Sequence, residues 1–149
     1  MLNIENLTNL TINQKLLEEI SKALLKKNES REIDLTICDN RTIQEYNKIY
    51  RGKDKATDVL SFPIESDIIV NSTQMPLGSL IISADFIEKK AIELKHTNDD
   101  ELSLLFIHGL LHLLGFDHEI DNGEMRKKEE EIIHQFHLPE SLIIRTEEM

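Results

Sequence analysis

Residues 102–118 read LSLLFIHGLLHLLGFDH, and this stretch decides which fold the chain can adopt. From Leu102 to Leu114, apolar side chains fall on almost every side of a helix. A helix that is apolar all round is buried inside a protein, whereas a surface helix keeps one polar face. We therefore expect this segment to be the central, most buried helix of the fold.

Three histidines in this stretch have the spacing of a metal site. His108 and His112 lie four residues apart, so on a helix their imidazoles share one face. Gly115 can take a left-handed conformation that ends the helix, after which the chain can bring His118 back to the same point. Three imidazoles suit a tetrahedral zinc ion with water in the fourth position. We therefore expect His108, His112 and His118 to bind one divalent metal, with Zn²⁺ the first expectation. Nickel, copper and iron also accept imidazole, and two core histidines bonded to backbone are the alternative without a metal.

The residue after the first histidine separates this stretch from a peptidase motif. The metzincin peptidases have the same ligand spacing, H-E-x-x-H-x-x-G-x-x-H, in which the glutamate is the general base. This chain has Gly109 at that position, and glycine has no side chain to move a proton. Either a water on the metal reacts without that carboxylate, or a base comes from elsewhere in the fold.

Length and cysteine content fit a single reduced domain. The 149 residues are enough for one domain with its own core, so we expect one domain over residues 1–149. Cys38 is the only cysteine, which excludes a disulfide within the chain and favours a reducing compartment. The first residues lack the pattern of a secretory signal, and no apolar run reaches the ~18 residues that a membrane span needs. We therefore expect a cytoplasmic protein without a membrane partner.

The charge is strongly negative but unevenly spread. A net charge of −11 argues against general affinity for nucleic acid. Residues 41–55, however, hold five basic and two acidic residues, which leaves +3 in that segment. The basic residues are Arg41, Lys48, Arg51, Lys53 and Lys55. This segment can hold phosphate, or it can be a solvated helix end and loop.

Hydrophobic periodicity predicts about four short strands and five helices. The strands are expected at residues 2–5, 33–38, 59–62 and 78–83, and the helices at residues 12–24, 43–52, 84–94, 100–114 and 125–136. Residues 64–76 read as an exposed excursion in which residues 68–70 could pair at a sheet edge. Helices and strands mixed in this way indicate an α/β or α+β layer fold.

Two helices carry capping signals at their start. Thr11 with Gln14 resembles a capping box before the first helix. Asp121 with Glu124 can cap the last helix. The apolar stripe of that last helix has one polar exception, Glu129.

A second motif lies upstream of the histidines. Residues 50–63 read YRGKDKATDVLSFP, and together with residues 108–118 they resemble the YbeY family of bacterial endoribonucleases. The resemblance extends through residues 78–83 and on to Met125. It implies a metal-dependent endoribonuclease that prefers single strands and acts in rRNA maturation, at the 3′ end of the small-subunit rRNA, and in ribosome quality control. It also implies a four-stranded, mostly parallel sheet against a helical core.

Site residues follow from the same resemblance. It makes His108, His112 and His118 the ligands of one zinc-like metal and matches Arg51 to the family's functional, catalytic arginine. Relatives commonly have Gly-Asp before the last strand's apolar run, where this chain has Gly78-Ser79. The implied partners are single-stranded or ribosomal RNA and, as protein partners, ribosomal proteins or other ribosome assembly factors. The strongly negative net charge leaves open whether the protein binds RNA by itself or is brought to it by a basic ribosomal partner.

Two other functions remain open at this point. One is a metallohydrolase with another substrate, peptides included, which the absent glutamate opposes. The other is a non-enzymatic ribosome-associated factor whose metal is structural. A structural zinc site needs a fourth protein ligand, for which His96 or Asp117 is a candidate. Asp117 could also orient a ligand or cap the turn. For Asp58 and Ser61 we expect backbone shaping of the groove.

Overall fold

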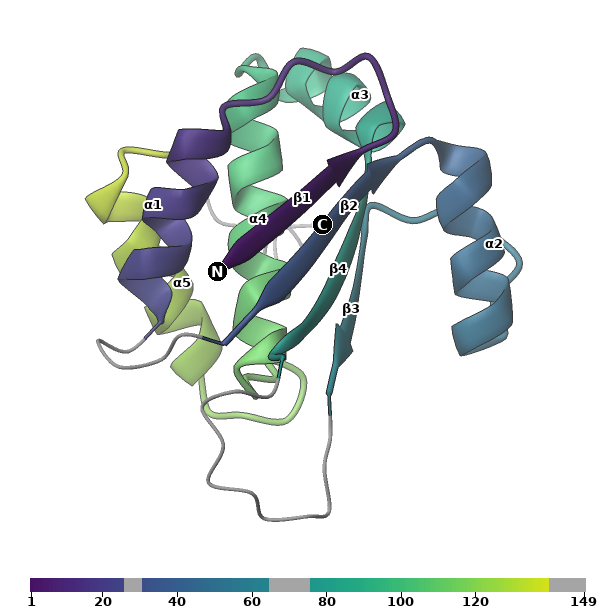
Figure 1. The fold of residues 1–149 in the computed structure, drawn as a ribbon. Coiled ribbons are helices and arrows are strands. Elements are labelled where there is room, and N and C mark those ends of the chain that lie inside the picture. Colours follow the sequence, from purple (N-terminus) through teal and green to yellow (C-terminus); the bar gives the residue numbers. More distant parts are fainter. Residues whose placement is uncertain (26–30, 65–75, 140–149) are drawn as a thin grey trace.

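The computed structural model describes residues 1–25, 31–64 and 76–139 (Figure 1). The strands are β1 (Leu2–Asn6), β2 (Ile33–Cys38), β3 (Val59–Pro63) and β4 (Gly78–Ser83). The helices are α1 (Gln14–Leu24), α2 (Asn40–Arg51), α3 (Ala84–Leu94), α4 (Asn98–Leu113) and α5 (Glu124–Gln135). Every element expected from the periodicity is present within these residues.

The four strands form one mixed sheet in the order β1-β2-β4-β3. The pairs β1–β2 and β2–β4 are parallel, whereas β3 runs antiparallel to β4 and is the edge strand on that side. The α/β class and the mostly parallel sheet are therefore confirmed. The middle strands β2 and β4 are the most buried, as expected of strands that helices cover.

The helices are unequally divided between the two faces of the sheet. Figure 1 shows α1, α4 and α5 along one face and α2 on the other side, beyond β3 and β4. The main core joins α1, α4 and α5 to the inward side chains of β2 and β4. A smaller core lies under α2 and consists of Cys38, Ile43, Leu60 and Ile81.

Helix α4 is the central helix, as expected. Leu104, Leu105 and Phe106 are no more than 1% exposed, and the apolar residues around them are buried as well. A capping box starts the helix: Asp100 N–H donates to Thr97 Oγ1 at 3.0 Å, and Thr97 N–H donates to Asp100 Oδ2 at 3.2 Å. This buried helix gives the histidines a rigid base.

Two details differ from the expected caps. The N-cap of α1 is Asn13, whose side chain accepts from Leu16 N–H, so Thr11 is not the cap. The N-cap of α5 is Gly123 in a left-handed conformation, and Asp121 instead bonds Gly123 N–H and Met125 N–H from outside the helix. At α1, Thr11 and Asn13 are both short polar residues that can accept from the free N–H groups, and the sequence alone does not say which of them does. At α5, Asp121 does accept from Met125 N–H, a free N–H of the first turn, as a capping side chain would.

Part of the expected excursion lies outside the described residues. This holds for residues 65–75, including the possible edge pairing at 68–70. Within the residues that the structure describes, no helix is both long enough and apolar enough to cross a membrane.

Candidate metal centre and cleft

The end of α4 is built by a glycine turn. Gly115 has a φ of 98°, which confirms the expected left-handed conformation. Its N–H donates to His112 O at 3.0 Å, and Phe116 N–H donates to Leu111 O at 3.0 Å. This pair of bonds is a Schellman motif, which reverses the chain at a helix end. The reversal carries His118 back toward the last turns of α4.

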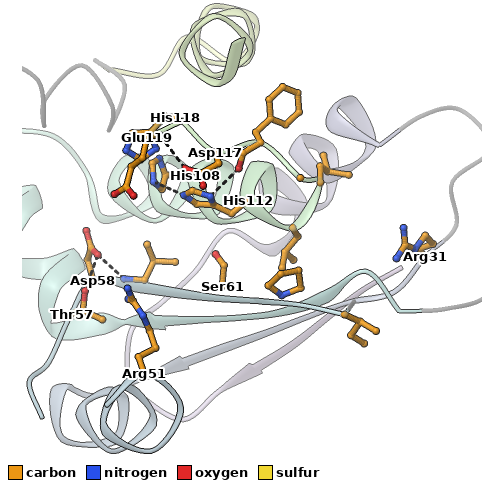
Figure 2. A pocket seen from close by; sticks show the side chains of 17 residues that line it. Arg31, Arg51, Thr57, Asp58, Ser61, His108, His112, Asp117, His118 and Glu119 are labelled. Atoms are coloured by element: carbon orange, nitrogen blue, oxygen red, sulfur yellow. Dashed lines mark hydrogen bonds between the residues drawn. The ribbon is translucent and has the colours of Figure 1, made fainter. Parts of the chain in front are cut away.

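The structure brings the three predicted histidines together. One nitrogen from each of His108, His112 and His118 can be chosen so that all three lie within 4.8 Å of one another. The Nε2 atoms of His108 and His112 are 3.3 Å apart. All three side chains are half-buried, and Figure 2 shows them gathered on one side of a cleft.

Two of the imidazoles are oriented by partners behind them. His108 Nδ1–H donates to the carboxylate Oε2 of Glu129, on α5, at 3.2 Å. His112 Nδ1–H donates to the backbone carbonyl of Phe116 at 3.0 Å. With Nδ1 protonated in both rings, both Nε2 atoms present lone pairs to the same point. Metal-bound histidines have this arrangement, with the second ring nitrogen donating to a carboxylate or a carbonyl.

The donor set fits a divalent metal ion. A tetrahedral zinc with Zn–N bonds of about 2.0–2.1 Å places its nitrogen ligands roughly 3.3–3.4 Å apart, which is the separation of the His108 and His112 Nε2 atoms. Two facing lone pairs at this distance repel unless a cation or a proton lies between them. His118 Nδ1 is buried without a hydrogen-bond partner among the described residues. A metal at that nitrogen would satisfy it.

Protonation favours the same conclusion. Burial lowers the pKa of His112 below its usual value, and the neighbouring His108 lowers it further, while the bond to the Phe116 carbonyl acts in the opposite direction. Only a neutral imidazole can bind a metal. The site therefore keeps His112 in its metal-binding form at neutral pH.

The histidines line a cleft of about 870 Å³ between α4 and the edge of the sheet. Arg51, the last residue of α2, lines it too, and Figure 2 shows its guanidinium reaching into the cleft from the side opposite the histidines. Gly52 ends α2 in a left-handed conformation with φ 70°, which fixes where Arg51 leaves the helix. The predicted arginine and the predicted ligands thus face the same space.

Other polar side chains of the cleft are bonded to backbone. Asp58 Oδ1 accepts from Val59 N–H at 2.7 Å, and Ser61 Oγ donates to Gly109 O at 3.3 Å. Asp117 Oδ1 accepts from Glu119 N–H at 3.0 Å within the turn. These contacts agree with the expected shaping role of Asp58 and Ser61 and favour turn capping for Asp117.

The candidate fourth ligands do not join the histidines. His96 lies at the other end of α4, where its Nε2 bonds Glu101 Oε1 at 2.9 Å, so the expectation that it could approach the site is wrong. Within residues 1–25, 31–64 and 76–139, no further His, Cys, Asp or Glu completes the group. A structural zinc normally has four protein ligands, so the structural-metal alternative lacks its main requirement.

The position of Gly109 also weighs against the peptidase alternative. Gly109 is buried, and a Cβ added there would lie 2.8 Å from Leu80 Cδ2 and 3.3 Å from both Ser61 Oγ and Val59 Cγ2. This position therefore faces β3 and β4. A side chain here would start against side chains of the sheet and not in the open cleft, so the metzincin general base has no counterpart at this position.

Sequence reasoning missed two residues and left one unplaced. For Glu129 the sequence offered one signal, a glutamate within the apolar stripe of the helix that follows the three histidines. Arg31 lines the cleft at the end away from Arg51, as Figure 2 shows, and donates to Pro76 O at 3.3 Å. No sequence signal pointed to it. Ser79 of β4 pairs with Phe62 of β3. It lies on the sheet face away from the histidines and does not line the cleft.

Comparisons with known proteins identify the family of the chain. A family model described as "Endoribonuclease YbeY" matches residues 3–137. An Endoribonuclease YbeY of Sulfurovum sp. (strain NBC37-1) is 52% identical over 148 residues, covering 99% of this chain and 98% of that protein. Another, from Aliarcobacter butzleri (strain RM4018), is 54% identical over 146 residues, with 97% and 99% covered.

The fold is also found in a solved structure. The solution structure of TM1509 from Thermotoga maritima is similar with a TM-score of 0.60 and 27% sequence identity. The similarity covers 92% of both chains.

Proposed function

This chain belongs to the endoribonuclease YbeY family, and from that premise we propose that it cleaves single-stranded RNA with a divalent metal ion held by His108, His112 and His118. One observation carries the proposal: three imidazoles converge on one point of a cleft, and Arg51 reaches into that cleft from the opposite side. Both parts are needed to cleave a phosphodiester, because charge develops on its non-bridging oxygens and has to be neutralised.

The residues of the chain divide the work between binding and orientation. Arg51 can hold a phosphate through the two parallel hydrogen bonds that its planar guanidinium offers. Glu129 and the Phe116 carbonyl keep the rings of His108 and His112 in the orientation that ligands need. When bound there, a divalent ion supplies Lewis-acid chemistry at a phosphoryl oxygen and can lower the pKa of a water molecule toward about 7.

Zinc is the proposed metal, since three imidazoles converge in a half-buried site and the Nε2 atoms of His108 and His112 have the 3.3 Å separation that tetrahedral zinc favours. For the substrate we propose rRNA during small-subunit 3′-end maturation and ribosome quality control, in the cytoplasm where ribosomes are made. We propose that residues 1–149 act as one domain. A net charge of −11 supports a role for basic ribosomal proteins or assembly factors in bringing the enzyme to its substrate.

The test is cleavage of single-stranded rRNA fragments by the zinc-loaded full chain. Four proteins are compared: wild type, His112→Ala, Arg51→Ala and Arg41→Ala. Arg41 is an exposed arginine at the other end of the same helix and does not line the cleft, so its variant is the charge-matched control. Circular dichroism establishes that each variant is folded.

We expect wild type and Arg41→Ala to cut and the other two to lose activity. Loss of one phosphate-binding or charge-stabilising group of this kind costs about 10²–10³ in kcat. If Arg51→Ala and Arg41→Ala cut equally well, Arg51 has no part in the reaction. If His112→Ala cuts as well as wild type, the histidine cluster is not the active centre.

A further inference from the structure

Three aromatic side chains form a cluster beside the cleft, which we call the aromatic platform: Tyr46 and Tyr50 of α2 and Phe62 of β3. The rings of Tyr46 and Tyr50 are stacked, with centroids 6.0 Å apart and planes 17° apart. The ring of Phe62 meets Tyr50 edge to face, with centroids 5.4 Å apart. Tyr46 and Phe62 pack on the smaller core, whereas Tyr50 remains 64% exposed.

The contacts of Tyr50 make it more than a scattered surface aromatic. Single exposed apolar residues are common and need no function. Tyr50, however, contacts two partly buried rings, which restrict the rotamers of its side chain while most of its surface stays exposed. A ring fixed in this way can bind a flat partner without a further entropic cost for ordering the side chain.

The platform and the cleft lie on opposite sides of one strand. Along β3, Val59, Ser61 and Pro63 line the cleft, while Phe62 points to the other face of the sheet. β3 is an edge strand, so a chain leaving the cleft can pass around it without crossing the body of the protein. Arg51, whose side chain lines the cleft, is the residue directly after Tyr50.

Charge at this edge suits a polyanion. Residues 41–55 carry +3 in a protein with a net charge of −11. Lys53 and Lys55 follow α2 directly and are exposed. Lys48 also belongs to this segment but lies 3.9 Å from Asp54, which partly neutralises it. Exposed aromatic rings beside basic side chains are typical of sites for single-stranded nucleic acid, where bases stack and phosphates are neutralised.

We propose that the aromatic platform stacks an unpaired base of the RNA next to the scissile phosphate, with Tyr50 in direct contact and Lys53 and Lys55 near the adjoining phosphates. This inference rests on the proposed ribonuclease function and adds to it a binding subsite outside the metal cleft. It gives a physical reason for a preference for single strands, because a base paired in a duplex cannot turn its face to Tyr50.

The experiment measures cleavage kinetics and binding of a single-stranded oligoribonucleotide by the zinc-loaded full chain. Binding is followed by stopped-flow fluorescence of 2-aminopurine placed at successive positions of the RNA. The variants are Tyr50→Ala, Tyr50→Phe and Ile49→Ala. Ile49 is 73% exposed on the same helix and is no part of the platform, so it is the control for removing an exposed apolar side chain.

We expect Tyr50→Ala to raise Kd and KM by about 5- to 150-fold, the effect of losing one base–aromatic stack, while kcat changes little. Tyr50→Phe keeps the ring and should behave as wild type, as should Ile49→Ala. Replacing the stacked nucleotide with an abasic one should weaken binding to wild type but not to Tyr50→Ala.

Three results would overturn the platform. One is equal RNA affinity of Tyr50→Ala and Ile49→Ala while wild type still cuts RNA, which leaves the ribonuclease function standing. Another is an equal loss in Tyr50→Phe and Tyr50→Ala, which would point to the hydroxyl group and not to stacking. The third is a wild type that neither binds nor cuts RNA, which would overturn the proposed function itself.

Discussion

Removing the carboxylate of Glu129 tests whether the partner behind His108 determines metal affinity. Glu129 is 1% exposed, and its Oε2 accepts from His108 Nδ1–H at 3.2 Å. Without this acceptor the imidazole loses both its fixed tautomer and its fixed orientation. Loss of such a partner typically lowers metal affinity by about 10- to 100-fold. A glutamine keeps an accepting oxygen but not the charge. We therefore expect a loss of metal affinity of about 10-fold in Glu129→Gln and about 100-fold in Glu129→Ala.

The change can be converted into stability. A 10- to 100-fold rise in Kd is about 1.4–2.8 kcal/mol of binding free energy. With metal in excess, stabilisation by the ligand falls by the same amount. For a chain of this length, 1 kcal/mol shifts Tm by roughly 2–4 °C. The increase in Tm on adding zinc should therefore be about 3–11 °C smaller in the variants than in wild type.

The assay is competition for zinc against a chromophoric chelator, together with thermal unfolding with and without zinc. Glu130→Gln is the matched control, because Glu130 is the next residue of the same helix and pairs at the surface with Arg126 at 3.4 Å. It removes the same charge but leaves the histidines untouched. If folded Glu129→Ala binds zinc as tightly as Glu130→Gln, the carboxylate does not support the metal site, and the reasoning is refuted.

Three other expectations follow from individual residues. Gly115→Ala places a Cβ at a φ of 98°, which should cost about 1–2 kcal/mol in urea unfolding; an unchanged unfolding midpoint would mean that the turn relaxes without strain. Burial first, and then the charges of Asp39 and Asp85, raise the pKa of the Cys38 thiol to about 11, so the native protein at pH 8 should not react with Ellman's reagent although the unfolded protein does. The pKa of Asp39 is lowered from its usual 3.8 by hydrogen bonds from Thr42 at the start of α2. A carboxylate whose pKa is lower in the folded than in the unfolded state stabilises the fold at pH values above its unfolded pKa, and this contribution is lost as the pH falls. The stability of wild type relative to Asp39→Asn should therefore decrease as the pH falls below about 3.8. Parallel acid-unfolding curves of the two proteins would contradict this.

The order of the elements and the grouping of the three histidines could be predicted because the signals are local. Alternation over residues 33–38 and 78–83 marks strands, and nearly continuous apolar residues over 102–114 mark a buried helix. The i, i+4 spacing of two histidines and a glycine before the third depend only on helix geometry and on the freedom of glycine at positive φ. The N-cap of α1 is Asn13 and not Thr11, because both are short polar residues that can accept from the same N–H groups, whereas the predicted Asp121 does accept from Met125 N–H at the start of α5.

The sequence by itself therefore determined the class of fold, the three histidines as a group and the family resemblance, since each depends on spacings of a few residues or on a motif read along the chain. Only the tertiary structure placed Glu129 behind His108, Arg51 across the cleft and Tyr50 in contact with Phe62. It also turned Gly109 toward the sheet and His96 away from the site. These partners come from elements far apart in the chain, and which of them meet is decided by how α2, α4 and α5 pack against the sheet.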